Sequence, residues 1–493
     1  MRKFLRISLA GLSVILLVAI ALILWPQRAA PLPEPENSRI IHNVRVIDVH
    51  QGTASEPVSV VIRDGVIAAI GPELKTSGRP ALDASGAFLV PGFWDMHVHT
   101  FQSSPQMHLP LWVAGGVTNV RDMMDCPGEE DSLIACSADK RRWNAETERG
   151  RLAAPRIVEM ASYHLEGADI TAAEASHRVQ RYHARGLDAV KVYNRLDPKA
   201  YSAAARQARA LGMRLVGHLP LSIALEEAIA AGQVSFEHAH LLARHCFGRA
   251  AAWRAGKLAE VPPAALLEEI VATHDAVRCE AAATALAEAG AWYVPTHVTR
   301  EEDARAHDPQ FASDPRLDYL DPLSRFAWED DQESTRTRYA GPLGEKALTD
   351  YFGHGLTLTG MAHDRGVGVL VGTDTIVGGL RYHDELEHLV RAGLSPAEVL
   401  RAATLDAARY ARMDATSGSI EVGKRADLVL LDANPLDDIG NTRQIRAVIH
   451  HGRLYDRKRL DELLAFVRAE AAAPHNWVKL LWGFARSSVV SDL

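Results

Sequence analysis

Histidines are frequent in this chain, and several of them follow short apolar runs. The sequence holds 22 histidines among 493 residues. The segment Asp95-Met96-His97-Val98-His99 directly follows the apolar run Ala87–Trp94. Residues two apart in a strand point to the same side, so both imidazoles can bind one metal ion. A single His-x-His also arises by chance in a histidine-rich chain, so the pair alone is a weak signal.

Further metal-binding groups lie in or directly after other apolar runs. They are Lys191 between two valines, His218 after Gly217, His238 after Glu237, and Asp374 after Thr373. Each has an ordinary alternative, because a buried lysine can pair with a carboxylate and an aspartate after a strand often caps a helix. Since all of these groups occur at the ends of such runs, the pattern predicts one metal site.

The apolar runs alternate with longer stretches of helical periodicity. Eight runs read as strands: Ala87–Trp94, Gly116–Asp122, Arg156–Met160, Ala189–Tyr193, Arg214–Gly217, Val234–Glu237, Trp292–Thr296 and Val367–Thr373. Strands that alternate with helices predict a parallel sheet, and eight such units fit an α/β fold of the (β/α)₈ barrel type. The active-site groups of such barrels lie at the carboxyl ends of the strands. A doubly wound sheet is the alternative, but no Gly-x-Gly-x-x-Gly follows any run.

The segments flanking the barrel are rich in short strands. Val58–Ile62 and Val66–Ile70 surround Asp64-Gly65, which is typical of a hairpin, and Leu428–Asp432 and Ala447–Ile449 resemble further strands. We expect these pieces to form one small β-sandwich with the barrel inserted. The predicted segments are 1–27 (membrane anchor or signal), 28–37 (linker), 38–84 (sandwich, first part), 85–412 (barrel), 413–458 (sandwich, second part) and 459–493 (C-terminal helix and tail).

The N-terminal segment predicts a membrane helix. Arg2, Lys3 and Arg6 precede an uncharged apolar run, Ile7–Trp25. As a helix this run would be about 28 Å long, close to the ~30 Å hydrocarbon core of a bilayer. The basic flank would stay in the cytoplasm, which anchors the chain in the inner membrane with its catalytic domain in the periplasm. A cleaved signal that releases the chain to the periplasm, and a buried core helix, are the alternatives.

The net charge and the cysteines bear on the partners and the location of the protein. A net charge of −8 without a long basic run argues against a nucleic-acid partner. The cysteines are Cys126, Cys136, Cys246 and Cys279. Disulfides are compatible with an extracytoplasmic location, and local pairing of Cys126 with Cys136 is the preferred prediction. Free or buried thiols are the alternative.

The combination of these residues resembles the amidohydrolase superfamily of metal-dependent hydrolases. The matching segments are Pro91-Gly92-x-x-Asp95-x-His97-x-His99, Lys191, His218, Glu237-His238 and Gly372-Thr373-Asp374. Further matches are Gly115–Thr118, Leu394–Glu398, Ala402–Thr404 and Gly418–Val429. The likeness covers roughly residues 38–458 and is strongest to the imidazolonepropionase-like branch, which includes prolidase-type dipeptidases.

The resemblance implies a distorted barrel, a composite β-sandwich and two divalent metal ions, with zinc as the default for imidazole and carboxylate ligands. His97, His99 and Asp374 would hold the more buried ion, and His218 and His238 the second. Lys191, carbamylated by carbon dioxide, would bridge the two ions. Its apolar neighbours favour the neutral amine that carbamylation requires.

The implied activity is hydrolysis of a C–N bond, amide or peptide-like, in a small-molecule or dipeptide-like substrate. A hydroxide that bridges the metals would attack the carbonyl carbon, while Asp374 accepts a proton and passes it to the leaving nitrogen. The alternatives are a hydrolase of lactones, esters, phosphotriesters or carbamates at the same site, a mononuclear deaminase of cyclic amidines, and a non-catalytic, membrane-tethered binding module. Such deaminases carry a glutamate where this chain has Leu221.

Polar residues near the ends of the runs are candidate substrate contacts. They are Arg121, His164, His297, Arg381 and Tyr382. A structural role is the alternative for each, since Arg121, for example, could pair with a neighbouring aspartate. Prolidase-type relatives often carry a tyrosine close behind the fifth-strand histidine, where this chain has Leu219-Pro220. The expected partner is a small molecule, and association into a homo-oligomer is left open.

Overall fold

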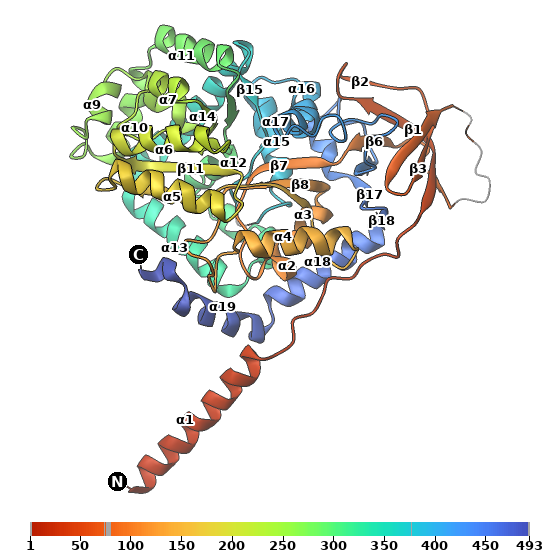
Figure 1. The fold of residues 1–493 in the computed structure, drawn as a ribbon, viewed down its shortest axis with the longest axis horizontal. Coiled ribbons are helices and arrows are strands. Elements are labelled where there is room, and N and C mark those ends of the chain that lie inside the picture. The colour runs from red at the N-terminus through yellow and green to blue at the C-terminus, as the bar shows by residue number, and fades with distance from the viewer. Residues whose placement is uncertain (1, 73, 75–79, 376, 492–493) are drawn as a thin grey trace.

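The computed structural model describes residues 2–72, 74, 80–375 and 377–491. The outermost residues of the first and last predicted segments, 1 and 492–493, lie outside this description. Figure 1 shows a barrel-shaped body, a β-rich lobe formed by both flanks of the chain, and an N-terminal helix that projects away from them.

Eight parallel strands form the barrel. They are β7 (Phe93–Val98), β8 (Val117–Asp122), β9 (Arg156–Met160), β11 (Ala189–Leu196), β12 (Arg214–Gly217), β13 (Gln233–Glu237), β14 (Trp292–Val294) and β15 (Gly368–Val369), with a short β10 (Leu165–Gly167) beside β11. A bridge between Ala161 and Ala189 joins β9 to β11. The backbone N–H of Met96 donates to the carbonyl oxygen of Val371 at 2.8 Å, which closes the barrel between its last and first strands.

Helices connect the strands and cover the barrel. The first group is α2 (Ser104–Met107), α3 (Leu109–Ala114), α4 (Ser137–Glu148), α5 (Ala172–Ala184), α6 (Pro198–Ala210), α7 (Leu225–Ala231), α8 (His240–Cys246) and α9 (Ala250–Arg254). The second is α10 (Pro263–Ala272), α11 (Ala276–Glu288), α12 (His297–Ala304), α13 (Pro322–Arg338), α14 (Gly341–Asp364), α15 (Tyr382–Arg391), α16 (Pro396–Arg401) and α17 (Ala407–Tyr410). Caps set their starts: Thr171 accepts from the backbone N–H of Glu174 at α5, and Ser395 caps α16.

Strands from both flanks share one sheet. Its order is β18-β17-β16-β6-β1-β3-β4, built from β1 (Ser38–Asp48), β3 (Val58–Arg63), β4 (Val66–Gly71), β6 (Phe88–Pro91), β16 (Leu428–Leu431), β17 (Ile445–His450) and β18 (Arg453–Asp456), while β2 (Thr53–Ala54) and β5 (Ala81–Asp83) pair with β1. The hairpin of β3 and β4 turns at Asp64 and Gly65, whose φ angles are 51° and 73°. Two positive φ values match the right-handed twist of the flanking strands.

The predicted first strand of the barrel, Ala87–Trp94, is divided between the two sheets. β6 pairs antiparallel with β16, and β7 begins only at Phe93. The chain changes sheets at Pro91-Gly92, where a Cβ on Gly92 would lie 2.2 Å from the hydroxyl of Thr118. Only glycine allows this close approach. A continuous apolar run conceals such a crossing, because both strands are buried.

The predicted transmembrane helix is wrong. Within the described residues, no helix combines the length and the apolar character needed to cross a bilayer. α1 spans Arg2–Ile23 and so begins among charged residues, while Leu24 and Trp25 lie in a turn. The uncharged helical part, 7–23, is only about 26 Å long at 1.5 Å per residue. The Trp25 ring instead stacks on His475 of the C-terminal helix α19 (Pro474–Arg486), which follows α18 (Arg457–Ala471).

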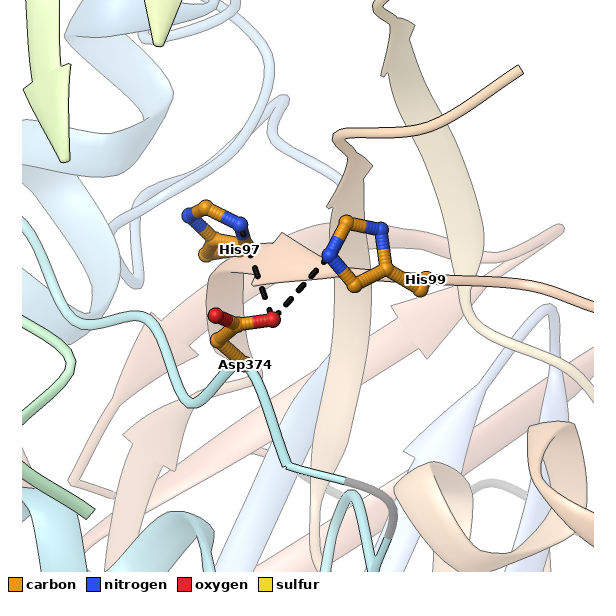
Figure 2. A group of neighbouring side chains, drawn as sticks. All are labelled: His97, His99 and Asp374. Atoms are coloured by element: carbon orange, nitrogen blue, oxygen red, sulfur yellow. Dashed lines mark ion pairs between the residues drawn. The ribbon is translucent and has the colours of Figure 1, made fainter. Parts of the chain in front are cut away.

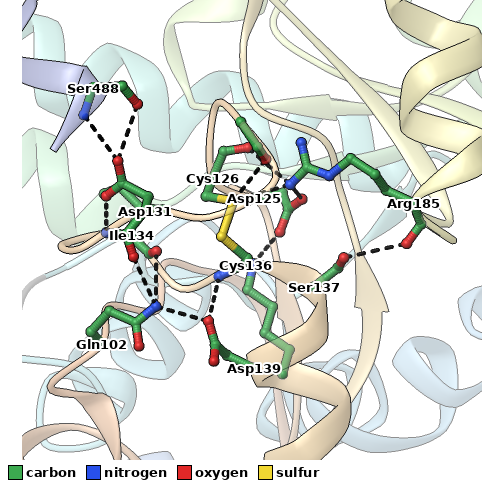
Figure 3. Close-up of a disulfide and its surroundings, with 12 residues drawn as sticks. Gln102, Asp125, Cys126, Asp131, Ile134, Cys136, Ser137, Asp139, Arg185 and Ser488 are labelled. Carbon is green, nitrogen blue, oxygen red and sulfur yellow. Dashed lines mark hydrogen bonds and ion pairs between the residues drawn. A yellow bond between two sulfur atoms is a disulfide. The ribbon is translucent and has the colours of Figure 1, made fainter.

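Both cysteine pairs are disulfides, and the predicted pairing of Cys126 with Cys136 is confirmed. Figure 3 shows this bridge between the loop after β8 and the start of α4. Asp131 in the same loop accepts hydrogen bonds from Ser488 near the C-terminus. The second bridge joins Cys246 at the end of α8 to Cys279 in α11. Each bridge fixes a segment that directly follows a barrel strand.

Candidate metal centre

His97, His99 and Asp374 come together at the carboxyl end of the barrel (Figure 2). Each offers one ligand atom, and these atoms all lie within 4.8 Å of one another. An oxygen of Asp374 lies 3.0 Å from Nε2 of His99 and 3.7 Å from Nε2 of His97. The strand alternation of β7 directs both histidines to the same side. Asp374 reaches them because its backbone N–H donates to the carbonyl oxygen of His97 at 2.8 Å.

His218 and His238 form a second pair beside this group. Their Nε2 atoms are 2.9 Å apart, and the ring of His238 lies 5.1 Å from that of His97. Nδ1 of His218 is hydrogen-bonded to Asn194 and Nδ1 of His238 to Thr296, each at 2.8 Å. Because Nδ1 is engaged in both rings, Nε2 is the atom that each can offer to a cation. The second oxygen of Asp374 lies 3.8 Å from Nδ1 of His238, so the carboxylate lies between the two groups.

Glu237 and Arg121 hold His97 in place from inside the barrel. Glu237 accepts from Nδ1 of His97 at 2.9 Å and pairs with Arg121 through both carboxylate oxygens, at 2.8 and 2.9 Å. Nε2 of His97 is buried and has no hydrogen-bond partner among the described residues. An unpaired buried nitrogen is costly, and a divalent cation would satisfy it. The donor set therefore fits a metal ion.

The protonation states of these groups suit metal binding. Burial alone would raise the pKa of Asp374, but His97 and His99 hold it well below its ordinary value, so the group is a carboxylate. Burial lowers the pKa of His238 to about 3 and that of His218 well below normal. Neutral imidazoles and an ionised carboxylate are the forms that bind metals.

Lys191 lies on β11 with only 2% of its surface exposed. Burial lowers its pKa to about 8, and its charge in turn contributes to the lowered pKa values of His99 and His218. Its backbone N–H donates to Ser162 at 3.0 Å. The lysine side chain therefore belongs to the same electrostatic group as the histidines, in surroundings that favour the neutral amine.

Among the predicted substrate contacts, His164 remains beside the centre. Its ring stacks on Tyr193 with centroids 4.3 Å apart, and Tyr193 contacts the ring of His218 at 4.1 Å. Burial and the charge of Lys191 lower the pKa of His164 to about 2, so the ring is neutral. It forms part of an aromatic wall next to the second histidine pair.

The side chains of the other four predicted substrate contacts are engaged with neighbouring residues, and their role as substrate contacts stays a prediction. Arg121 is fully buried and makes five hydrogen bonds, to Met96, Ser235, Tyr410 and both oxygens of Glu237. Tyr382 is fully buried and donates to the carbonyl oxygen of Trp94. Arg381 pairs with Glu301, Glu302 and Asp384, and His297 is buried against Thr359 and Phe352. In the structure these side chains are therefore held by neighbouring residues of the barrel and its loops.

Several supporting residues are absent from the predicted set. Glu237, Asn194 and Thr296 orient the three histidines, and Asp95 accepts from both the N–H and the hydroxyl of Thr373, next to Asp374. The sequence did indicate a direction for the side chain of Glu237. Ser235 and Glu237 are two residues apart in a predicted strand and so point to the same side of it. Asn194, near the end of β11, and Thr296, just after β14, lie beyond the apolar part of their predicted runs or at its end, where the sequence gave no sign of their role.

We expect Glu237→Gln to lower metal affinity by about 10–100-fold, the usual effect of losing a partner that orients a metal-binding histidine. The amide cannot balance the buried charge of Arg121, and it binds Nδ1 of His97 less strongly. Metal titration of the stripped protein measures the effect. Glu288→Gln, at an exposed position of α11, is the matched control. Unchanged affinity in Glu237→Gln would contradict the positioning role.

The chain was compared with known families and curated proteins. The model of the amidohydrolase family matches residues 88–455. A dihydroorotase from Trichlorobacter lovleyi is 46% identical over 104 residues, which is 20% of this chain and 24% of that protein. An N-acetylglucosamine-6-phosphate deacetylase from Lysinibacillus sphaericus is 34% identical over 91 residues, 17% of this chain and 23% of that protein. These matches thus span a quarter or less of either relative.

Solved structures match over most of the chain. A bottromycin amidohydrolase superposes with a TM-score of 0.69 at 22% identity, covering 89% of this chain and 92% of that one. An Xaa-Pro dipeptidase with methionine bound in its active site gives 0.58 at 19% identity, covering 85% of this chain and 100% of that one. At such identities the similarity shows a shared fold.

Proposed function

Because this chain belongs to the amidohydrolase family, we propose that it is a metal-dependent hydrolase that cleaves a C–N bond in a small molecule. The observation that carries the proposal is the convergence of His97, His99 and Asp374, whose ligand atoms lie within 4.8 Å of one another. The adjacent pair of His218 and His238, with Nε2 atoms 2.9 Å apart, supports a second cation site.

The family generally uses divalent metals such as zinc. We propose that His97, His99 and Asp374 hold one ion and that His218 and His238 hold another, with zinc favoured by the imidazole and carboxylate donors. Lys191 is proposed to be a carbamate that bridges them. Its neutral amine adds carbon dioxide and releases one proton, which leaves an anionic group with two oxygen donors. Burial of this side chain supports the neutral starting form.

Bound divalent cations would supply a polarised carbonyl group and a water of lowered pKa. The protein's own contribution is proton transfer and orientation. Asp374 is ionised and lies between both histidine groups, so it can accept a proton from the attacking water and return it to the leaving nitrogen. An amine leaves poorly unless it is protonated, which makes this transfer essential for an amide.

A substrate screen tests the proposal directly. The full chain, loaded with zinc, is offered N-acyl amino acids, dipeptides including Xaa-Pro, and lactones. We expect hydrolysis of amide substrates that is lost on chelation and restored by metal. Turnover of lactones alone would replace the C–N assignment with ester chemistry at the same site. A chelator-insensitive activity would contradict the metal-dependent mechanism.

We also propose that the protein works in an oxidising compartment outside the cytoplasm, such as the periplasm. Two disulfides that account for all four cysteines support this, since disulfides persist mainly in such compartments. Free thiols are first blocked in intact cells, and the denatured protein is then reduced and alkylated with a second reagent. We expect the second reagent to label all four cysteines. No labelling after reduction would mean that the thiols were free and already blocked, and it would contradict the proposal.

A further inference from the structure

Two cavities adjoin α8: the first lies between α8, α9 and the segment after β12, and the second lies where α8, α12 and α14 meet. The first has a volume of about 30 Å³, and most of its wall is apolar, including Leu219, Leu221, Leu241 and Trp253. Glu237, His240, Arg244, His245 and Arg254 complete its wall. The second, about 50 Å³, is lined by Arg244, Arg300, Asp303, Tyr339, Tyr351 and Phe352. Arg244 belongs to both walls, so an apolar space and a polar space adjoin at its guanidinium.

The first cavity lies next to the second histidine pair. Leu219 directly follows His218, and the ring of His240 stacks on His238 with centroids 5.5 Å apart. His240 and Arg244 are four residues apart on α8, and so lie on one face of that helix. On the other side, the pKa of Arg300 is raised although burial alone would lower it, because Asp303, Tyr351 and Asp374 lie near its charge. A molecule in the first cavity would therefore lie beside His238 and Glu237, next to the metal centre.

Two polar groups in the second cavity lack partners. The described residues offer the Arg244 guanidinium neither a hydrogen bond nor an acidic partner, and its central carbon lies 5.6 Å from the centroid of the Trp253 ring. The side chain of Tyr351 is buried, with 7% of its surface exposed, and its hydroxyl has no hydrogen-bond partner among the described residues. By contrast, Arg300 is paired with Asp303 at 2.7 Å. Arg244 and Tyr351 both line the second cavity, and an anionic oxygen group bound there would satisfy the half-buried guanidinium and the buried hydroxyl.

Size and charge identify the ligand chemistry. A water needs about 10–15 Å³ of such space, so the second cavity can hold a carboxylate group. Arginine binds carboxylates through paired hydrogen bonds, and the tyrosine hydroxyl can donate another. The adjoining apolar cavity is small, and it fits a short aliphatic side chain rather than an aromatic ring.

We propose that Arg244 and Tyr351 bind the free carboxylate of the substrate, while the apolar cavity takes the aliphatic side chain beside it. The preferred substrates are then N-acyl derivatives of small apolar amino acids, dipeptides included, whose amide lies at the metal centre. This inference rests on the proposed function, and it names the substrate class for that site. Arg300 is already paired with Asp303, so Arg244 carries the proposed charge recognition.

Binding to the metal-stripped full chain tests the subsite without any need for turnover. Calorimetry compares N-acetylvaline with its uncharged carboxamide. We expect the acid to bind at least about 10-fold more tightly, as for charge-assisted hydrogen bonds. Arg244→Met should remove this preference, and Tyr351→Phe, which deletes only the hydroxyl, should reduce it several-fold. Arg206→Met, at an exposed arginine of α6, should leave it unchanged.

Steady-state kinetics of the zinc-loaded enzyme provide a second test of the subsite. The ratio of kcat/KM for the acid over the carboxamide should fall at least about 10-fold in Arg244→Met, while kcat/KM for the carboxamide changes little. Equal binding of acid and carboxamide to the unmodified protein, binding of neither, or a preference that survives Arg244→Met would overturn the subsite. Binding that follows the expected pattern without hydrolysis of any amide would uphold the subsite and count against the proposed function alone.

Discussion

Asp374→Asn is expected to reduce kcat for amide hydrolysis by at least about 10²–10⁴-fold, the contribution of a positioned general base and acid. The asparagine amide has nearly the same shape and still offers an oxygen, but it cannot accept a proton at neutral pH. Its neighbours remain in place, because the backbone N–H of Asp374 is held by His97 and Thr373 is held by Asp95. Metal content should therefore largely survive. Steady-state kinetics and metal analysis of the purified variant measure the two effects separately.

The matched control is Asp364→Asn, at an exposed position near the end of α14. It makes the same chemical change away from the metal centre and should behave like the unmodified protein. Wild-type-like kcat in Asp374→Asn would exclude the carboxylate as the proton acceptor. Loss of activity together with complete loss of metal would instead assign Asp374 to metal binding alone.

The regular parts of the site could be predicted from the sequence because strand geometry fixes them. His97 and His99 alternate on one strand, and the carboxyl ends of parallel strands meet at one end of a barrel. These two rules predict that His99 and Asp374 lie together although they are far apart in the sequence. In the structure, Nε2 of His99 is 3.0 Å from a carboxylate oxygen of Asp374. The hairpin at Asp64-Gly65 followed in the same way, because the turn type restricts which residues can form it.

Side-chain direction inside the barrel could not be predicted. Arg121 and Tyr382 are polar residues near strand ends, which is the description of a substrate contact, yet both are fully buried. Arg121 points inward because β8 directs it toward Glu237 and Ser235 of β13, and a buried carboxylate needs a counter-charge. That pairing joins strands far apart in the sequence. No local pattern in either segment indicates it.

The subsite at Arg244 was missed for a related reason. It lies in α8, on a short helix whose place is set by the disulfide of Cys246 to Cys279 and by packing against α14. In the sequence Arg244 is one of many arginines, and most of those form ion pairs on the surface. What distinguishes Arg244 is its place, because its side chain lines both cavities and, among the described residues, makes neither a hydrogen bond nor an ion pair. Only the three-dimensional arrangement reveals this.

Lys191→Ala is expected to remove most of the activity, by at least about 10³-fold, and to lower the metal content from two ions toward one. Without the lysine there is no carbamate, so the second ion keeps His218 and His238 as its only protein ligands, below the three protein ligands usual for catalytic zinc. The buried space that the side chain vacates is next to the histidines and can admit a small carboxylic acid. Millimolar acetate or propionate should therefore restore part of both the activity and the second ion.

Rescue of Lys191→Ala by a small carboxylic acid distinguishes two roles of Lys191: a carbamate that bridges the metal ions, and a side chain that only fills space. A short carboxylate supplies the two oxygen donors of a carbamate, whereas it cannot repair a packing defect left by a lost lysine chain. Lys199→Ala, at an exposed position of α6, should show neither loss nor rescue. Activity of the metal-free unmodified protein, reconstituted with zinc, should likewise depend on added bicarbonate. Full activity in Lys191→Ala would exclude the carbamate, and so would reconstitution that does not depend on bicarbonate. The histidines would then bind the metal without a bridging group.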